Sequence, residues 1–378
     1  MLAATAALFA ACAETDLVNE VNVVAEPQAI GFETFAQKAT RADEGTSNTA
    51  LEFHHESFIV WASKQLGVED NVSYTQVYST EKPGTVTIID GKWVASPLKF
   101  WDKAALNYYF YAAAPTVPTE KGWEYVNKTE NDYSTGYLTL KDYTLVGTNL
   151  TPEEDEEGEL VGTWIKETSG DKDLMIAGME DRSNATFNSN SAQKIDEVHF
   201  TFRHILSKLN IKVMGDLEST YGTITLNTLD VCNLICKGSF SEQNNPRWTL
   251  NSDVYTLKMR QSDLVLNDEF VYTHEYLVMP QTVAHLDTKN VGVQPASGVY
   301  LHIKYTITTG TGAAASSEVF ETYYGLADIF GNTALALNEG SQNTLAITIA
   351  PDVIEFEVST DANGWDNKEE DIVDSPKL

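Results

Sequence analysis

Short runs of alternating apolar and polar residues recur along nearly the whole chain, and this pattern constrains the fold more than any other feature. Successive side chains of a β-strand point to opposite faces, so such runs predict strands with one buried face. The runs are rich in β-branched and aromatic residues and are bounded by Gly, Pro and Asp, as strands are. They cover residues 58–63, 84–94, 106–115, 222–231, 275–281, 299–307, 317–324, 344–350 and 353–358.

No stretch keeps a helical period long enough to predict a substantial helix. Short strands at regular spacing are typical of β-sandwiches, so we predict an all-β protein built from such sandwiches. Within the run 84–94, Asp90 and Gly91 lie between two apolar segments, which predicts a tight β-hairpin at that point.

The segment 198–214 predicts a strand that is interrupted near its middle. Its apolar residues change phase by one position: Val198, Phe200, Phe202, His204 and Leu206 share one face, and Leu209, Ile211 and Val213 share the other. Such a slip predicts a bulge or a helical turn near 205–208, and a helix through 203–210 is the alternative. Because His204 lies in the apolar phase, we expect it to be a core histidine with a hydrogen-bond partner.

The chain is long and strongly acidic. Its 378 residues suggest two domains, and the polar stretch 184–194 predicts a boundary between β-sandwiches over 48–188 and 189–378.

The chain contains 25 basic and 55 acidic residues, which gives a net charge of −30. Such a charge repels nucleic acid and anionic lipid headgroups, so no nucleic-acid partner is expected. The simplest role of the charge is to keep an exposed protein soluble, and a cationic partner is the alternative.

The sequence lacks the motifs of common catalytic sites, namely G-x-S-x-G, H-E-x-x-H and G-x-x-x-x-G-K-[ST]. His54 and His55 would lie on opposite faces of a strand, which is a poor arrangement for shared metal binding. We therefore predict no enzymatic activity, no catalytic residue, no metal and no cofactor, and a hydrolase is the alternative.

Cys232 and Cys236 would have Cα atoms about 13 Å apart on one strand. A disulfide requires less than about 7 Å, so free thiols are expected.

Seven tryptophans raise the alternative of glycan binding, because sugars stack on aromatic faces. Trp61, Trp93 and Trp101 lie in strand-like segments and are expected in the core, whereas Trp365 lies in a polar tail. A glycan-binding protein should instead present Trp or Tyr side chains clustered on one exposed face.

The N-terminus carries a short apolar run over residues 2–11. It is too short to span a bilayer, which takes about 20 residues, and it suits a signal peptide over 1–11. The letters "FAAC" that end at Cys12 resemble the lipobox of bacterial lipoproteins, in which the peptide is cut before the cysteine and the cysteine is acylated, for example with palmitate. An ordinary signal peptide with an incidental Cys12 is the alternative. Residues 13–28 are polar and acidic and predict a tether.

Several motifs follow one another in an order that resembles the fimbrillin-like proteins of the bacterial type V pilin superfamily. They are "FAAC", a strand followed by "ATRA", "FIVWAS", Trp93, "PLKFWDKAALNYYFYAAAP", "DLMIA", "FTFRHILSKLNIKV", "YLVMPQ" and "TLAITIAPDVIEFEVSTDANGW". The resemblance covers nearly the whole chain. It implies two transthyretin-like β-sandwich domains in tandem, and a lipoprotein that is exported to the outer membrane and the cell surface.

The resemblance also implies that an arginine-specific protease cuts in a loop after the first strand. Arg41 matches that position, with Lys38 as a weaker candidate and an incidental arginine as the alternative. Glu14 and Asp16 resemble the acidic residues that accompany surface export of such lipoproteins. Residues 12–47 would thus form a lipidated tether and a removable first strand.

We therefore predict a structural subunit of a surface fimbria, a type V pilus, or a pilus-associated adhesin that assembles by protease-triggered strand exchange. Ile354, Phe356 and Val358 alternate near the C-terminus and are the predicted donor strand, with the last strand of the chain's own domain as the alternative. The expected partners are other fimbrial subunits in a homo- or hetero-polymer, the arginine-specific protease, and the outer membrane through a lipid on Cys12. A monomeric surface lipoprotein that binds glycans is the alternative function.

Overall fold

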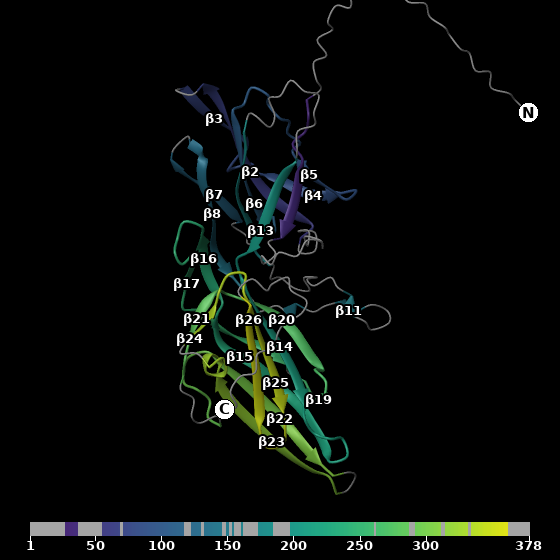
Figure 1. Cartoon of the computed structure of the whole chain (residues 1–378). Helices are drawn as coiled ribbons and strands as arrows, with labels where there is room; N and C mark the ends of the chain where they lie inside the picture. The colour runs from purple at the N-terminus through teal and green to yellow at the C-terminus, as the bar shows by residue number, and fades with distance from the viewer. Residues whose placement is uncertain are drawn as a thin grey trace, which may run out of the picture.

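The described residues form an elongated molecule built mainly from β-strands, with most of the early strands in one half and most of the late strands in the other (Figure 1). The predicted all-β class is confirmed. A short helix, α2 (Leu326–Ile329), lies in the second half. The computed structural model describes residues 27–36, 55–68, 71–116, 122–129, 132–145, 149–150, 153–154, 160–161, 173–183, 197–260, 262–286, 292–310, 314–331 and 334–361. None of these residues forms a helix that is long and apolar enough to cross a membrane.

The first half is built on an eight-stranded sheet that curls into a barrel. Its strands are β1 (Phe32–Ala36), β2 (Ser57–Val68), β3 (Asn71–Tyr78), β4 (Gly84–Ile89), β5 (Lys92–Ser96), β6 (Asn107–Ala114), β12 (Met175–Ser183) and β13 (Val198–His204). The pairing runs β2-β4-β5-β1-β13-β12-β6, and β6 pairs with β2 again, so every strand except β3 belongs to a closed ring. Buried phenylalanines fill the interior of this ring: Phe32, Phe58, Phe110, Phe200 and Phe202.

A second sheet covers part of the outer face of the barrel and joins the two halves. It consists of β7 (Trp123–Thr129), β8 (Asp132–Thr144), β16 (Lys237–Ser241) and β17 (Trp248–Leu250), in the order β17-β16-β8-β7. Strands distant in sequence therefore share one core, in which Trp123 and Leu138 lie in the same cluster as Phe240 and Trp248. The strands β13, β16 and β17 all follow the predicted boundary 184–194 yet pair with the first half. That stretch lies outside the described residues.

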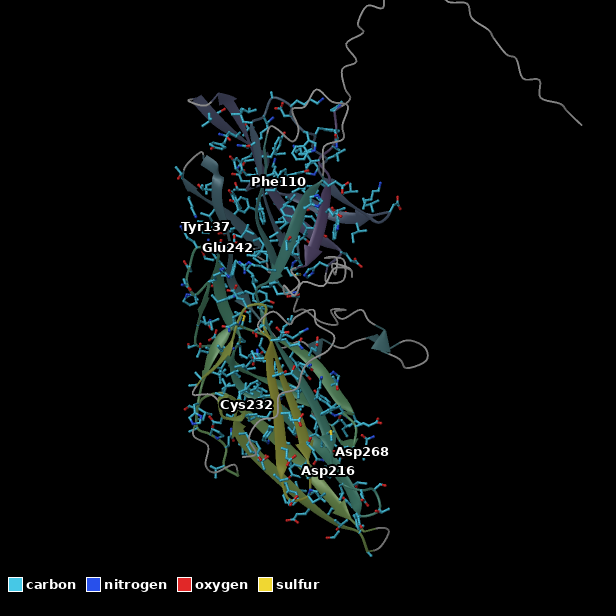
Figure 2. The ribbon with its side chains drawn as sticks, viewed as in Figure 1. Phe110, Tyr137, Asp216, Cys232, Glu242 and Asp268 are labelled. Carbon is cyan, nitrogen blue, oxygen red and sulfur yellow. The ribbon has the colours of Figure 1, made fainter. Side chains whose placement is uncertain are left out.

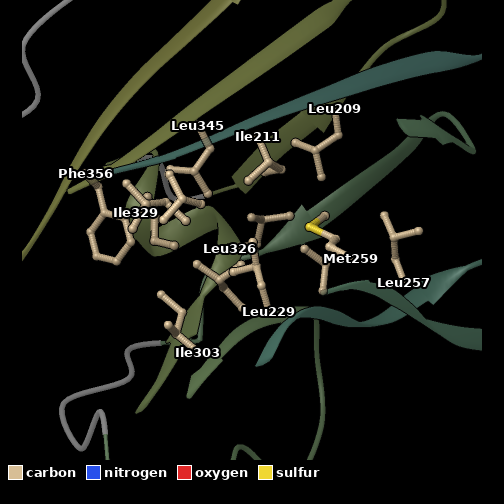
Figure 3. Close-up of a cluster of buried hydrophobic side chains, with 14 of the residues drawn as sticks. Leu209, Ile211, Leu229, Leu257, Met259, Ile303, Leu326, Ile329, Leu345 and Phe356 are labelled. Carbon is tan, nitrogen blue, oxygen red and sulfur yellow. The ribbon is translucent and has the colours of Figure 1, made fainter. Parts of the chain in front are cut away.

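The second half is a sandwich of two five-stranded sheets. One sheet contains β26 (Ile354–Asp361), β25 (Gln342–Ile349), β14 (Ser207–Gly215), β20 (Tyr272–Val278) and β9 (Asn149–Leu150). The other contains β18 (Val254–Arg260), β15 (Gly222–Ile235), β22 (Tyr300–Thr309), β23 (Ser316–Gly325) and β19 (Leu264–Leu266). Figure 3 shows inward side chains of β14, β25 and β26 from one sheet meeting those of β15, β18 and β22 from the other, and those of α2, in one apolar cluster. Two short ladders complete the fold: β10 (Glu153–Glu154) with β11 (Leu160–Val161), and β21 (Gln281–Ala284) with β24 (Ala334–Leu337).

Strands β13 and β14 follow one another directly and carry the chain from the barrel into the sandwich. Only Ile205 and Leu206 separate them, so the interruption predicted near 205–208 is confirmed and the helical alternative is wrong. Both residues are fully buried and belong to the core that the two halves share. The backbone of Ile205 donates to the Leu174 carbonyl at 2.9 Å and accepts from Trp248 Nε1 at 2.7 Å. The phase slip therefore turns the apolar face from one core to the next.

His204 is a buried histidine with a carboxylate partner, as predicted. Its Nδ1 lies 2.7 Å from Oδ2 of Asp173, and both side chains are almost completely buried. Asp173 begins the segment "DLMIA", so this hydrogen bond joins two of the motifs that the sequence presents far apart.

The predicted hairpin at Asp90 and Gly91 is confirmed, since β4 pairs with β5 and both turn residues have positive φ angles of 51° and 71°.

Cys232 and Cys236 are free and buried, and burial raises the pKa of both thiols. In Figure 2, Cys232 lies in the second half, well away from Phe110 in the barrel.

Trp61 and Trp101 are buried as expected. Trp93 is half-buried and packs against Phe58 with ring centroids 5.1 Å apart. The described residues contain no group of three His, Cys, Asp or Glu side chains placed to hold a metal ion.

Candidate functional site

The position of β1 between β5 and β13 is the first candidate assembly site, and we call it the β1 seat. Residues 28–36 fill it. The strand pairs in parallel with β13, Phe32 opposite Val198, and in antiparallel with β5, Phe32 opposite Trp93. Further backbone hydrogen bonds fix the segment before the strand: Ile30 N donates to the Lys99 carbonyl at 2.9 Å, Trp101 N to the Gln28 carbonyl at 3.0 Å, and Val198 N to the Gly31 carbonyl at 2.9 Å.

Alternate side chains of this segment point into the barrel. Ile30, Phe32 and Thr34 are only 2–3% exposed. The Phe32 ring stacks on Phe200 at 6.0 Å and meets the edges of Phe58 at 6.1 Å and Phe110 at 6.2 Å. Phe32 is thus in contact with side chains from three other strands of the ring, and the first strand is a central part of the barrel core.

The topology gives β1 a special position, because it is the link between β5 and β13 in the ring. Without it, both neighbours would present unpaired backbone groups, and the phenylalanine cluster would open to water. Edges of this kind readily accept another strand. The β1 seat can therefore bind an extended segment that is apolar at alternate positions and runs parallel to β13.

Strand β26 is the second candidate site, and it lies at the edge of the C-terminal sheet. It pairs in antiparallel with β25, Phe356 opposite Ile347, and among the described residues it has no strand on its other side. Phe356 is buried and meets the ring of Tyr324 edge-on at 4.8 Å, while Ile354 and Val358 are partly buried against the same core. The three residues predicted as a donor strand share one face, and here they complete the chain's own sandwich.

A polar cleft of about 640 Å³ opens near the junction of the two halves, between the β16–β17 hairpin and the β21–β24 ladder. Glu339 on its wall accepts from Arg203 Nη1 at 3.0 Å and from Arg247 Nη1 at 2.9 Å. Burial, together with the nearby positive charge of Arg247, lowers the pKa of the Arg203 guanidinium. Since these charges already neutralise one another within the protein, the network stabilises the junction without offering an obvious charge to a ligand.

The other predicted site residues cannot be placed in this way. Cys12, Lys38 and Arg41 lie outside the described residues, although Arg41 follows shortly after Ala36, the last residue of β1. Trp365 and His54 also lie outside them.

The sequence pattern identified β1 and β26 as separate strands, but it missed that β1 closes a ring. It also missed a match between the two segments that is visible in the sequence itself: residues 30–34 read IGFET and residues 354–358 read IEFEV.

The class of protein that these features define is an all-β protein whose first described strand is built into its core. A comparison with protein-family models matches residues 40–365 to the model described as fimbrillin-like. The chain belongs to the fimbrillin-like family. A search of curated proteins finds no significant match.

Solved structures with a similar fold include a fimbrial protein from Bacteroides vulgatus, with 17% identity, a TM-score of 0.51, and coverage of 89% of this chain and 99% of that one. A structure from Bacteroides uniformis assigned to cell adhesion has 14% identity, a TM-score of 0.41, and coverage of 89% and 98%. The first of these similarities shows that the fold is one that a fimbrial protein adopts.

Proposed function

We propose that this chain is a structural subunit of a surface fimbria, or an adhesin carried by one, and that it assembles by exchanging β1 for the C-terminal strand of another subunit. Membership of the fimbrillin-like family supports a role in a pilus or in adhesion at the cell surface. The observation that supports the exchange step is the β1 seat: one short segment fills it, and that segment closes the barrel.

The C-terminal strand is a close chemical match for the segment it would replace. Residues 30–34 place isoleucine, phenylalanine and threonine at alternate positions, and residues 354–358 place isoleucine, phenylalanine and valine at the same spacing. In this register Phe356 takes the position of Phe32, and the β-branched Val358 takes that of Thr34. A donor strand that runs parallel to β13, as β1 does, would therefore insert equivalent side chains into the barrel.

Besides Thr34 and Val358, the two segments differ at one further position, where Gly31 corresponds to Glu355. A Cβ atom added at Gly31 would lie 2.9 Å from Cγ of Glu197, and the donor brings Glu355 to this position. Glu197 is partly exposed and has a flexible side chain, so it can rotate away. The two outward-facing residues of the donor segment, Glu355 and Glu357, are glutamates, whereas the segment 30–34 has Gly31 and Glu33 at these positions.

Cleavage explains why the exchange would not begin early. While β1 is joined to the rest of the chain, it returns to the β1 seat at the high effective concentration of a tethered segment, and a strand from another molecule competes poorly. After a cut at Arg41 the segment is held by non-covalent contacts alone, and its return becomes bimolecular. The subunit would thus stay monomeric until the protease acts, and the new partner would be another fimbrial subunit.

Treatment of the purified protein with an arginine-specific protease is therefore expected to yield polymer ladders on a gel. Replacing Arg41 by alanine should abolish the ladders, because β1 then stays attached, whereas replacing Lys38 by alanine should leave them unchanged. N-terminal sequencing of the cleaved product checks the site of the cut. Equal ladders from the Arg41→Ala variant would contradict the role of Arg41, and the absence of ladders from the native protein would contradict assembly by cleavage.

Export as a lipoprotein would place these subunits at the outer membrane before assembly. The short apolar run before Cys12 supports this step, and acyl chains contribute about 0.8 kcal/mol for each buried CH₂ group. The Cys12→Ser variant is expected to move from the membrane fraction to the soluble fraction of cells, whereas Cys232→Ser is the matched control and should stay membrane-bound. Unchanged membrane association of the Cys12→Ser protein would exclude Cys12 as the anchor.

A further inference from the structure

An aromatic cleft lies on the outer face of the barrel, where the hairpin formed by β2 and β3 packs beside β7 and β8 (Figure 1). It contains about 200 Å³ of empty space, and its enclosed part has room for about one water molecule. A larger ligand would therefore lie across the open mouth. The side chains that shape the cleft are Trp61, Ser63, Gln76, Tyr109, Tyr111 and Tyr125.

The aromatic rings of the cleft are held in fixed positions by the surrounding strands. Tyr125 packs against Tyr111 at 4.8 Å and stacks on Trp61 at 6.4 Å. Gly136 makes this arrangement possible, because a Cβ atom there would overlap the Tyr125 side chain, and its backbone N–H donates to the Tyr111 hydroxyl at 3.1 Å. The indole Nε1 of Trp61 is buried and has no hydrogen-bond partner among the described residues.

A set of amide groups continues the cleft along the same sheet face. Oε1 of Gln65 accepts from Asn107 Nδ2 at 2.9 Å and from the Tyr109 hydroxyl at 3.1 Å. This fixes the orientation of both amides, and within the described residues no protein group pairs with the Gln65 Nε2 donor or the Asn107 Oδ1 acceptor. Tyr74 from β3 adds a half-buried ring 6.2 Å from Tyr109.

We propose that this cleft binds a neutral glycan. Sugar rings have apolar C–H faces that pack on tyrosine rings, and their neighbouring hydroxyls both donate and accept hydrogen bonds. The half-exposed rings of Tyr74 and Tyr109 match the first property, and the fixed donor and acceptor of Gln65 and Asn107 match the second. Two partly exposed tyrosines, Tyr74 and Tyr109, thus lie together on one face, as expected of a glycan-binding protein, while the buried rings of Tyr111 and Tyr125 belong to the core.

The charges in and around the cleft decide which class of glycan fits. The side chains that line it are all uncharged. The single lysine of β2, Lys64, forms an ion pair with Asp102 at 2.5 Å. With a net charge of −30, the chain as a whole repels sialylated and sulfated sugars. The site lies outside the β1 seat, so binding does not require assembly. A fimbria would present many copies of it, and multivalent contact would raise the overall affinity.

The test uses the intact, uncleaved protein on an array of immobilised oligosaccharides that includes neutral, sialylated and sulfated members. We expect retention on neutral oligosaccharides that falls at least tenfold in the Tyr74→Ala and Gln65→Leu variants. The Tyr221→Ala variant is the matched control, because Tyr221 is a 67% exposed tyrosine in the second half, and it should bind like the native protein. Tyr74→Phe keeps the ring and should also bind, and melting temperatures verify that each variant is folded.

Periodate oxidation of the immobilised sugars should abolish the signal, because it destroys neighbouring hydroxyl pairs. Several outcomes would overturn the proposal: no retention on any neutral oligosaccharide, equal retention of all variants, or retention only on anionic sugars. Binding that survives periodate would also overturn it and would indicate a protein partner instead. Because uncleaved monomer is used, these outcomes are independent of whether the chain polymerises.

Discussion

Replacing Phe32 by alanine is expected to lower the free energy of unfolding by about 3–5 kcal/mol, the range for phenylalanine removed from a packed core. Phe32 is 3% exposed and contacts rings from three other strands, so the barrel cannot close the gap without moving several elements. Urea unfolding followed by tryptophan fluorescence measures the change, because Trp93 and Trp101 lie in or beside the same core.

The matched control is Phe100→Ala, since Phe100 is 47% exposed and its backbone forms a bridge with Ala29, just before β1. Exposed substitutions of this kind usually change stability by less than about 0.5 kcal/mol. If the two variants lost equal stability, β1 would not be a core strand, and the argument that its removal opens the barrel would fail.

A synthetic peptide of residues 352–361 is expected to bind the protease-cleaved protein and to stop it from polymerising. The peptide carries Ile354, Phe356 and Val358 in the order that suits the β1 seat, and each of these side chains contributes roughly 1.5–3 kcal/mol when buried. Backbone pairing with β5 and β13 adds to this, as in other strand-addition complexes. Uncleaved protein should not bind the peptide, because β1 occupies the seat.

Two control peptides make this prediction specific. Phe356→Ala in the peptide should weaken inhibition by at least tenfold, whereas Val353→Ala should not, since Val353 lies before the matching segment and is 41% exposed in the folded chain. A peptide is preferable to truncating the chain, because Phe356 also belongs to the core of its own sandwich. Polymerisation that proceeds unchanged in excess peptide would show that assembly uses another surface.

Local features of the fold were predictable from the sequence, because short-range chemistry determines them. Asp90 and Gly91 form the expected turn since both tolerate positive φ angles. The phase slip in 198–214 located the break at Ile205 and Leu206 within the predicted window, because one face of each strand has to be buried. His204 also has a buried hydrogen-bond partner, as expected, although the sequence did not identify Asp173 as that partner.

Long-range pairing was not predictable in the same way. The β16–β17 hairpin adds to β8 across roughly a hundred residues of sequence, and β1 pairs with β13 in parallel over an even greater separation. No turn connects these partners, so alternation alone contains no information about them. The aromatic cleft could not be predicted from the sequence for the same reason. Tyr74, Tyr109 and Tyr125 belong to three strands, and each alone resembles a core tyrosine. Of the tryptophans that the sequence argument for glycan binding considered, Trp61 lines the proposed cleft, but it is buried there, and the partly exposed rings are the tyrosines Tyr74 and Tyr109.

The direct continuation of β13 into β14 has a mechanical consequence for a fibre built through the β1 seat. Tension applied to an inserted strand would pass to β13 across a parallel ladder, whose hydrogen bonds are loaded together in shear and do not open one by one. From β13 it would pass along the backbone through Ile205 and Leu206 into β14, and then sideways to β25 and β26. The chain therefore offers a load path that crosses both halves with no flexible linker in between, so the subunit would transmit force as a stiff rod.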